Sequence, residues 1–386
     1  MPKRVIILGS TGSIGRSALD VVDNLGSELE VVGLAAGTRW EPLAEQVRRH
    51  RPAAVVLSDP AAAAQLEARL REMNLATAVW TGPDALTRLV ESVPCDFVLS
   101  AIVGIGGLPA TLAAVRRGLT VGLANKESLV VAGQLMVDAA RAFGAQLIPV
   151  DSEHSAIYQS LHAGSHDEVE RLLLTASGGP FRTWPRQRMA SATLNDALRH
   201  PTWNMGPKIT IDSATMMNKA LEIIEAKWLF SVDPDRIEVV IHPESIIHSM
   251  VAFRDGSIVA QMGSPDMRTP IQYALTYPRR LAGCGSRLDF SRLERMHFEP
   301  PDPERFPALR LGHQVARLGG TAGAAFNAAN EAAVDLFRAG RIGFLDIAAL
   351  VEGALERHKF DATPNLDALM AVDGWARSEV TQCCTV

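Results

Sequence analysis

Two carboxylates stand two residues apart, directly after an apolar segment that has the pattern of a β-strand. Asp151-Ser152-Glu153-His154 follows residues 146–150, and in an extended chain residues i and i+2 point to the same side. Asp151 and Glu153 could therefore bind one divalent cation such as Mg²⁺ or Mn²⁺. Two carboxylates do not complete such a site, so a third protein ligand must come from elsewhere in the chain.

Glu222 is the best candidate for that third ligand. It lies in a predicted helix with one apolar stripe, made of Ala214, Met217, Leu221, Ile224 and Trp228. Asn218 and Glu222 share another face, with Lys219 beside them. Asp212 or Ser213 is a credible N-cap, which would place the Ser213 hydroxyl and the helix N–H groups where a phosphate could bind. On spacing alone, an ordinary amphipathic helix with a solvated polar face accounts for the pattern more simply.

A second anion-binding candidate is Ser177-Gly178-Gly179, where the glycines permit a concave run of backbone N–H groups beside the Ser177 hydroxyl. The irregular segment 181–208 follows and contains His200, Trp203 and Met205. Long irregular segments in compact domains are commonly functional lids or disordered, and a lone Trp is more often a packing anchor than part of a lid. His242 and His248 have no common zinc spacing, and we expect structural roles for them.

A glycine-rich turn, Gly9-Ser10-Thr11-Gly12-Ser13-Ile14-Gly15, lies between the first predicted strand and a helix. Such turns bind the pyrophosphate of a dinucleotide, but a tight turn without a ligand would look similar. After the second strand no acidic residue stands before Glu41, whereas Arg39 could meet a 2′-phosphate. The pattern therefore favours NADP over NAD, with a solvated surface charge as the simpler alternative for Arg39.

Other polar residues follow later strands of the same region. Asn125-Lys126-Glu127 comes directly after a very apolar strand, at the sheet edge where ligands of α/β proteins bind. The triplet could equally be the solvated start of the next helix.

The elements that must position these residues indicate an α/β protein with further domains. Strands are predicted at residues 4–8, 29–35, 54–57, 97–101, 120–124 and 146–150, alternating with helices, which implies a doubly wound, Rossmann-like parallel sheet. Residues 237–241, 249–254 and 257–263 suggest an antiparallel meander with a hairpin turn at Asp255-Gly256. We therefore predict a nucleotide-binding domain (1–150), an α+β catalytic domain (151–288) with a lid near 181–208, a linker (289–307) and a C-terminal helical bundle (308–386).

The composition bounds what such a protein does. With 386 residues, two or three domains are expected, and 47 % hydrophobic and 21 % charged residues exclude wholesale disorder. A net charge of −5 gives no reason to expect nucleic acid or a membrane surface as partner. The scattered cysteines and the absence of a signal sequence or a convincing transmembrane segment favour a soluble, cytoplasmic protein.

The motifs together resemble the 1-deoxy-D-xylulose 5-phosphate reductoisomerase family. The matching segments are 9–15, 123–129, 149–154, 177–181, 200–206, 212–219, 241–245, 265–270 and 327–331, and they span nearly the whole chain. The resemblance implies a homodimer that converts 1-deoxy-D-xylulose 5-phosphate and NADPH to 2-C-methyl-D-erythritol 4-phosphate, through an enzyme-bound aldehyde, in non-mevalonate isoprenoid biosynthesis.

The resemblance also implies roles for individual residues. Asp151, Glu153 and Glu222 would hold Mg²⁺, Mn²⁺ or Co²⁺, and with Lys126 and His200 they would form the catalytic set. The substrate would contact Lys126, Ser152, Glu153, Ser177, His200, Ser213, Asn218, Lys219 and Glu222. The cofactor site would comprise Thr11, Gly12, Ser13, Ile14, Gly37, Thr38, Arg39, Asn125, Glu127 and Gly206, capped by Trp203 and Met205. After the glycine that corresponds to Gly37, the family often has Lys-Asn. This chain has Thr38-Arg39 there, so Arg39 keeps a positive charge for a 2′-phosphate.

Two alternatives stay open. Another NADP-linked dehydrogenase, such as a homoserine or semialdehyde dehydrogenase, would use the acidic residues structurally. A semialdehyde dehydrogenase would also need a nucleophilic cysteine, and Cys95 is poorly placed for that. A nucleotide-sensing protein without turnover would have no use for three carboxylates beside a phosphate site.

Overall fold

The computed structural model describes residues 1–203 and 205–383, and it divides into two compact units. The first unit comprises residues 1–128, 136–155 and 266–286, and the second comprises 129–135, 156–265 and 287–386. The division falls within two helices, α6 (Lys126–Phe143) and α7 (Ser152–Ser160). Within the described residues, no helix is both long and apolar enough to cross a bilayer.

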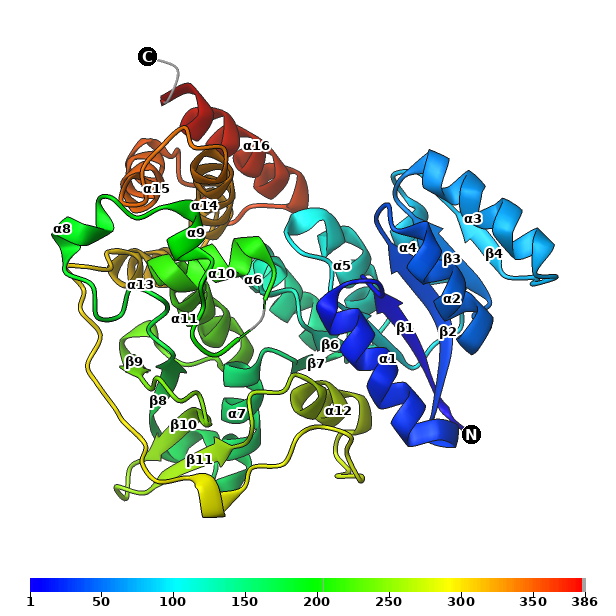
Figure 1. The fold of residues 1–386 in the computed structure, drawn as a ribbon, viewed down its shortest axis with the longest axis horizontal. Coiled ribbons are helices and arrows are strands. Elements are labelled where there is room, and N and C mark those ends of the chain that lie inside the picture. The colour runs from blue at the N-terminus through cyan, green and yellow to red at the C-terminus, as the bar shows by residue number, and fades with distance from the viewer. Residues whose placement is uncertain (204, 384–386) are drawn as a thin grey trace. The chain divides into compact units, whose positions relative to one another are not determined.

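The first unit is built on a seven-stranded parallel sheet with the order β4-β3-β2-β1-β5-β6-β7 (Figure 1). Its strands are β1 (Lys3–Leu8), β2 (Leu29–Ala36), β3 (Ala54–Leu57), β4 (Ala78–Trp80), β5 (Phe97–Ser100), β6 (Thr120–Leu123) and β7 (Gln146–Pro149). All six predicted strands are present. The sequence did not reveal β4, because this three-residue strand lies at the sheet edge and is only partly buried. The strand order reverses at β1, where ligands of such sheets bind.

Helices cover both faces of this sheet, which confirms the doubly wound prediction. They are α1 (Ser13–Leu25), α2 (Trp40–His50), α3 (Pro60–Glu72), α4 (Ala85–Ser92), α5 (Leu108–Arg116) and α12 (Arg268–Thr276). Val5 and Ile7 of β1 join the core formed with α1, α2, α3 and α12. Ile6 points the other way: it and Leu89 of α4 lie within 3.2 Å of where a Cβ on Gly33 would stand.

Residues 266–286 complete the first unit although they are distant in sequence. α12 packs on α1, and Lys3 Nζ donates a hydrogen bond to the carbonyl of Leu275 at 2.6 Å. Burial opposes ionisation of Asp266, but hydrogen bonds from Arg268 and the Ser286 N–H hold the pKa of Asp266 well below its usual range. Nothing in the sequence pattern predicted this return of the chain.

The second unit contains a four-stranded sheet with the order β11-β10-β8-β9. Its strands are β8 (Val169–Ala176), β9 (Ile237–Ile241), β10 (Ile247–Phe253) and β11 (Ile258–Met262). The hairpin at Asp255-Gly256 is confirmed, since β10 and β11 are antiparallel and Gly256 has a φ of 87°. The simple meander is wrong: β8 lies between β9 and β10 and is parallel to β9. β8 takes the place between β9 and β10, and all its residues except Glu170 and Arg171 are buried.

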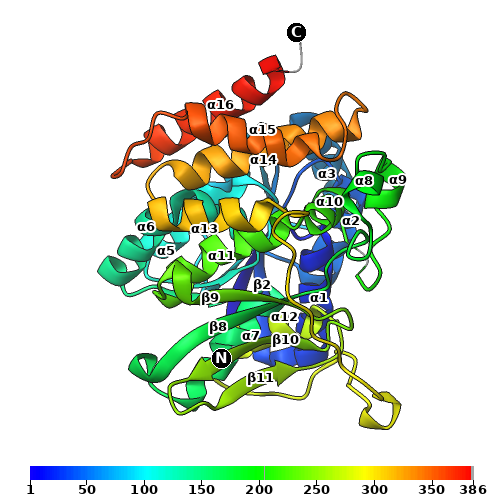
Figure 2. The ribbon, with the colours of Figure 1, turned by 90° about the vertical axis from the view of Figure 1, so that its left-hand side faces the viewer.

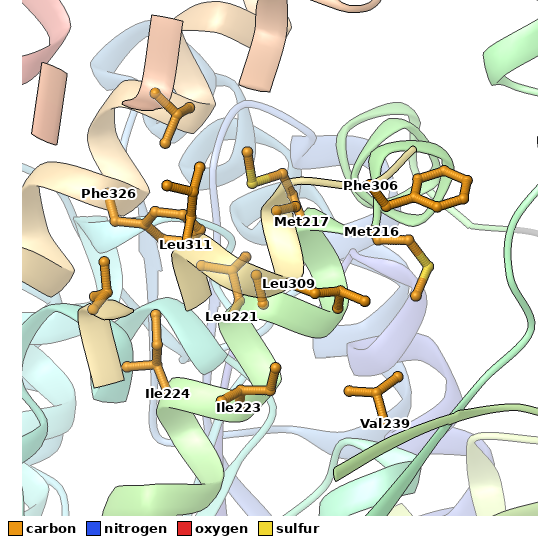
Figure 3. Packing of buried hydrophobic residues seen from close by; sticks show 14 of the residues in the cluster. Met216, Met217, Leu221, Ile223, Ile224, Val239, Phe306, Leu309, Leu311 and Phe326 are labelled. Atoms are coloured by element: carbon orange, nitrogen blue, oxygen red, sulfur yellow. The ribbon is translucent and has the colours of Figure 1, made fainter. Parts of the chain in front are cut away.

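Helices stack on this sheet in successive layers (Figure 2). The further helices of this unit are α8 (Arg186–Met189), α9 (Leu194–Ala197), α10 (Pro207–Thr215), α11 (Met217–Phe230), α13 (Ala308–Leu318), α14 (Ala322–Arg338), α15 (Asp346–Arg357) and α16 (Leu366–Cys383). α11 packs on α13, and α14 packs on both α15 and α16. Residues of α10, α11, α13 and α14 share one buried cluster with Met216, Met217 and Leu311 (Figure 3). The predicted α+β region and helical bundle are therefore both present.

Candidate functional site

The glycine-rich turn of the first unit is a tight backbone loop at the start of α1. Gly9 has a φ of 91°, and a Cβ there would lie 2.4 Å from the carbonyl oxygen of Ala101. A Cβ on Gly15 would lie 2.4 Å from the carbonyl oxygen of Gly9. Gly9 thus permits the turn and Gly15 permits the helix to pack against it, which leaves the N–H groups at the start of α1 available for an anion. Ser13 is exposed there, and Gly12 and Ile14 are partly exposed.

The segment after β2 lies against this loop. Gly37, Thr38 and Arg39 are exposed, and the Arg39 guanidinium donates a hydrogen bond to the backbone carbonyl of Thr11. Arg39 therefore contacts the phosphate-binding candidate rather than extending alone into solvent.

The triplet after β6 is buried, so its alternative as a solvated helix start is wrong. Asn125, Lys126 and Glu127 are 2 %, 6 % and 8 % exposed. The side-chain Oδ1 of Asn125 caps α6 by accepting hydrogen bonds from the Ser128 N–H and hydroxyl at 2.8 and 2.6 Å. The side-chain Nδ2 of Asn125 donates hydrogen bonds to the backbone carbonyls of Ile102 and Gly104. Asn125 thus ties the loop after β5 to the start of α6.

The acidic residues after β7 do not lie in an extended segment as predicted. Asp151 precedes α7 and its carbonyl accepts the Ser155 N–H at 2.8 Å, so Glu153 lies in the first helical turn. The expected proximity is nonetheless present, because a carboxylate oxygen of Asp151 and one of Glu153 lie within 4.8 Å of each other. Lys126 forms an ion pair with Asp151, and the Ser152 hydroxyl donates to Glu153 at 2.5 Å. An anionic cluster with one lysine therefore stands at the carboxyl end of β7.

The predicted helix that carries Glu222 is two helices in the second unit. Met216 has a φ of 61° and separates α10 from α11, so neither Asp212 nor Ser213 is an N-cap and both lie in the last turns of α10. Asp212 instead accepts hydrogen bonds from Lys208 at 2.6 Å and from Asn330 of α14 at 2.9 Å. The apolar stripe did not reveal the break, because Ala214, Met217, Leu221 and Ile224 are buried on both sides of it.

Glu222 is a buried carboxylate, with no exposed surface, on α11. The Asn218 amide donates to it at 2.6 Å, and the Lys219 ammonium forms an ion pair with its other oxygen. Lys219 is itself buried, so the face carrying these three residues is not a solvated one. A buried charge is stable only when paired and hydrogen-bonded, and this group meets that requirement.

The Ser177 loop and His200 lie together in the second unit. The Ser177 hydroxyl is 3.0 Å from His200 Nε2 and accepts the Gly179 N–H at 3.2 Å. His200 Nδ1 accepts the N–H groups of Thr202 and Trp203 at 3.1 and 2.9 Å. Because backbone N–H groups can only donate, the proton of the neutral ring is on Nε2 and is donated to Ser177. The hydrogen of the Ser177 hydroxyl therefore points away from its two donors, His200 Nε2 and the Gly179 N–H.

The remaining candidates occupy the same unit. Trp203 and Met205 are partly buried, and the Trp203 ring lies 6.4 Å from that of His248. Gly206 precedes α10 and is exposed. His242 donates through Nδ1 to the His297 carbonyl at 2.9 Å and accepts the Ile246 N–H at 3.2 Å. Both of its nitrogens bind backbone groups, as expected for a structural histidine.

Three family models match this chain. They describe 1-deoxy-D-xylulose 5-phosphate reductoisomerase over residues 5–133, its C-terminal domain over 147–230, and a DXP reductoisomerase C-terminal domain over 262–379. The reductoisomerase of Heliobacterium modesticaldum is 50 % identical over 382 residues, covering 99 % of this chain and 97 % of the relative. That of Pseudomonas aeruginosa is 48 % identical over 389 residues, covering 100 % and 98 %.

Solved structures agree over the full length. The enzyme of Zymomonas mobilis in complex with NADPH superposes with a TM-score of 0.94 at 46 % identity, covering 100 % of both chains. A DOX-P reductoisomerase in complex with NADPH, fosmidomycin and magnesium has a TM-score of 0.93 at 39 % identity, covering 99 % of this chain and 98 % of the other. The predicted enzyme class, an oxidoreductase that also isomerises its substrate, is confirmed, and the chain belongs to the 1-deoxy-D-xylulose 5-phosphate reductoisomerase family.

Proposed function

We propose that this protein converts 1-deoxy-D-xylulose 5-phosphate to 2-C-methyl-D-erythritol 4-phosphate with NADPH and a divalent metal ion. The full-length match to curated reductoisomerases at about half identity carries the proposal. It is the step of isoprenoid biosynthesis that the sequence motifs predicted.

Asp151, Glu153 and Glu222 would hold the metal ion. Their donor set is chemically suitable, since three carboxylates suit Mg²⁺ and Mn²⁺ and leave positions for water and substrate. The paired oxygens of Asp151 and Glu153, and a Glu222 carboxylate without solvent contact, are what a cation would neutralise. When bound, the ion would act as a Lewis acid on the substrate carbonyl and orient the neighbouring hydroxyl.

Ser177, Ser213, Asn218 and Lys219 would bind the phosphate. The tautomer of His200 supports this role for Ser177, because a hydroxyl that already accepts two hydrogen bonds has its hydrogen free to donate to a phosphate oxygen. Lys219 would supply the positive charge. Ser152, Lys126 and His200 would complete the substrate contacts, with Lys126 held by Asp151.

NADPH would bind along the first unit. The pyrophosphate would lie at the start of α1, on Thr11, Gly12, Ser13 and Ile14, and Arg39 with Gly37 and Thr38 would bind the 2′-phosphate. Asn125, Glu127 and Gly206 would contact the remainder of the cofactor, and Trp203 and Met205 would exclude water during hydride transfer.

The enzyme would act as a homodimer. The position of β11 supports this, because in the described part of the chain β11 lies at the edge of its sheet, where a strand of a second copy could pair with it, and its Ile258 is 54 % exposed. Sedimentation velocity tests this point, and a monomer at micromolar concentration would contradict it. The cytoplasmic location and the absence of nucleic-acid and membrane partners stay predictions.

The deciding experiment follows NADPH oxidation with 1-deoxy-D-xylulose 5-phosphate, with and without EDTA. We expect turnover that EDTA abolishes and that added Mg²⁺ or Mn²⁺ restores. Turnover unaffected by EDTA would remove the metal assignment, and no turnover under either condition would remove the function. A semialdehyde dehydrogenase is disfavoured, because burial raises the pKa of the Cys95 thiol and makes it a poor nucleophile.

A further inference from the structure

The Ser177 loop, residues 177–184, contains two adjacent glycines in a left-handed backbone conformation. Gly178 and Gly179 have consecutive positive φ values of 82° and 65°. A Cβ on Gly179 would lie 2.5 Å from the carbonyl oxygen of Ser213, so the loop approaches the end of α10 closely. Glycine has a wide choice of backbone conformations, and a loop built on two of them needs contacts from outside to fix the Ser177 hydroxyl.

Those contacts come from residues 299–305, which belong to the segment predicted as a linker. The Arg305 Nη1 donates to the backbone carbonyls of Arg182 and Trp184 at 2.8 and 3.0 Å. In the opposite direction, the Arg182 guanidinium forms an ion pair with Glu299. The C-terminal part of the Ser177 loop, residues 182–184, is thus bound by both Arg305 and Glu299.

This linker segment is itself anchored. The backbone of Glu299 exchanges two hydrogen bonds of 2.9 Å with Ile241 at the end of β9. Asp302 accepts the Arg305 Nε at 2.7 Å and the Arg305 N–H at 3.0 Å, which sets the orientation of the guanidinium. Phe306 is buried in the cluster that contains Met216 (Figure 3). The attachment points are therefore fixed by the sheet and the core of the same unit.

The loop also has its own apolar anchor next to these contacts. The ring of Phe181 is fully buried and lies 4.7 Å from the rings of both Trp184 and Phe344. This anchor holds the side chain of Phe181, whereas Arg305 binds the backbone carbonyls of Arg182 and Trp184, on either side of Thr183. The planar guanidinium can bind two carbonyls and a carboxylate at once, which a lysine ammonium on a flexible stem does less well.

We propose that Arg305 is a positioning residue for phosphate binding: it fixes the Ser177 loop through the carbonyls of Arg182 and Trp184. Arg305 does not itself bind the phosphate. The proposal rests on the proposed function, in which Ser177 binds the substrate phosphate, and it assigns a role in substrate affinity to a segment that the sequence presented only as a linker.

The test compares Arg305→Gln and Arg305→Lys with Arg310→Gln as the matched control. Arg310 lies on α13 and forms an exposed ion pair with Glu352, so its loss should change nothing at the site. For Arg305→Gln we expect the KM for 1-deoxy-D-xylulose 5-phosphate to rise about tenfold or more, as for loss of charge-assisted hydrogen bonds. The kcat and the KM for NADPH should stay within about twofold, and Arg305→Lys should be intermediate.

Inhibition by inorganic phosphate provides the second measurement. Its inhibition constant should rise by the same factor as the substrate KM, which a general loss of structure would not produce. An unchanged KM in folded Arg305→Gln, or equal losses in kcat and in both KM values, would overturn the proposal. Asp302→Asn keeps Arg305 but removes the carboxylate that orients it, and should raise the substrate KM and the phosphate inhibition constant by a smaller factor. If Arg305→Gln does not fold, this variant tests the proposal in its place, and unchanged constants would overturn it.

The two proposals fail differently. Wild-type protein that does not turn over the substrate would contradict the proposed function. In that case the inference on Arg305 is decided by calorimetric binding of inorganic phosphate to wild type and Arg305→Gln, where equal affinities would overturn it.

Discussion

The glycine loop of the first unit and the α10–α11 region of the second place their functional groups in different ways. In the loop, residues 9–15 are consecutive, and their conformation follows from glycines at the two positions where a Cβ would meet backbone. In the second region, the loop that carries Ser177 and contacts His200 reaches the end of α10 from a distant segment, and α10 meets α11, which carries Glu222, at Met216 with a φ of 61°. A ligand site made of consecutive residues is visible in the sequence, whereas a site assembled by packing is visible only in part.

The largest effect is expected where the second region depends on a buried charge. Glu222→Gln should lower kcat by about 10²–10³-fold, because it removes a proposed metal ligand and breaks the buried ion pair with Lys219. NADPH affinity should stay nearly unchanged, as measured by fluorescence titration. Glu238→Gln, at an exposed ion pair of β9, is the control and should be neutral. Equal activity of Glu222→Gln and wild type would remove the metal assignment.

The glycine loop should respond through its backbone instead. Gly9→Ala places a side chain at a φ of 91° and 2.4 Å from the Ala101 carbonyl oxygen. We expect a loss of roughly 3 kcal/mol in the free energy of unfolding, measured by urea denaturation, together with weaker NADPH binding. Gly374→Ala in α16, where a Cβ meets nothing within 4 Å, should be neutral or slightly stabilising. If both variants behave alike, conformation is not what selects Gly9.

A smaller effect is expected at Arg39, which tests whether the first unit also recognises NADPH through a positive charge. Arg39→Ala should weaken NADPH about tenfold more than NADH, since only NADPH carries the 2′-phosphate. Arg48→Ala, which removes an exposed ion pair with Glu45 on α2, is the control. Dissociation constants for both nucleotides give the answer, and an equal loss for both would show that Arg39 does not contact the 2′-phosphate.

The smallest effect concerns a residue of the second unit outside the site. Burial, and to a smaller degree Arg317, lower the pKa of His313, against the opposing influence of the Pro234 backbone and Asp235. A lowered pKa in the folded state means that this contribution to stability is present above the unfolded pKa of about 6.5 and is lost as the pH falls below it. His313→Gln should therefore reduce the drop in Tm between pH 7.5 and 5.5 by about 1–2 °C. An identical drop in both proteins would exclude His313 as a source of acid sensitivity.

Much of the fold could be predicted because it depends on local pattern. Six strands of the first sheet and the hairpin at Asp255-Gly256 follow from apolar runs and turn residues. The place of β8 between β9 and β10, and the return of residues 266–286 to the first unit, could not be predicted. The order of strands and the docking of distant segments depend on which apolar surfaces fit together in the folded protein. A short stretch of sequence does not contain that information.

The sequence by itself determined the type of chemistry, since the glycine loop, the pair of Asp151 and Glu153 and each family motif stand within a short stretch of the chain. Only the tertiary structure decided how these groups are presented. It buried Lys219 with Glu222, fixed the proton of His200 on Nε2, and attached the Ser177 loop to Arg305. The physical reason is that backbone conformation is governed by neighbours in the chain, whereas burial, pairing of charges and tautomers are governed by neighbours in space.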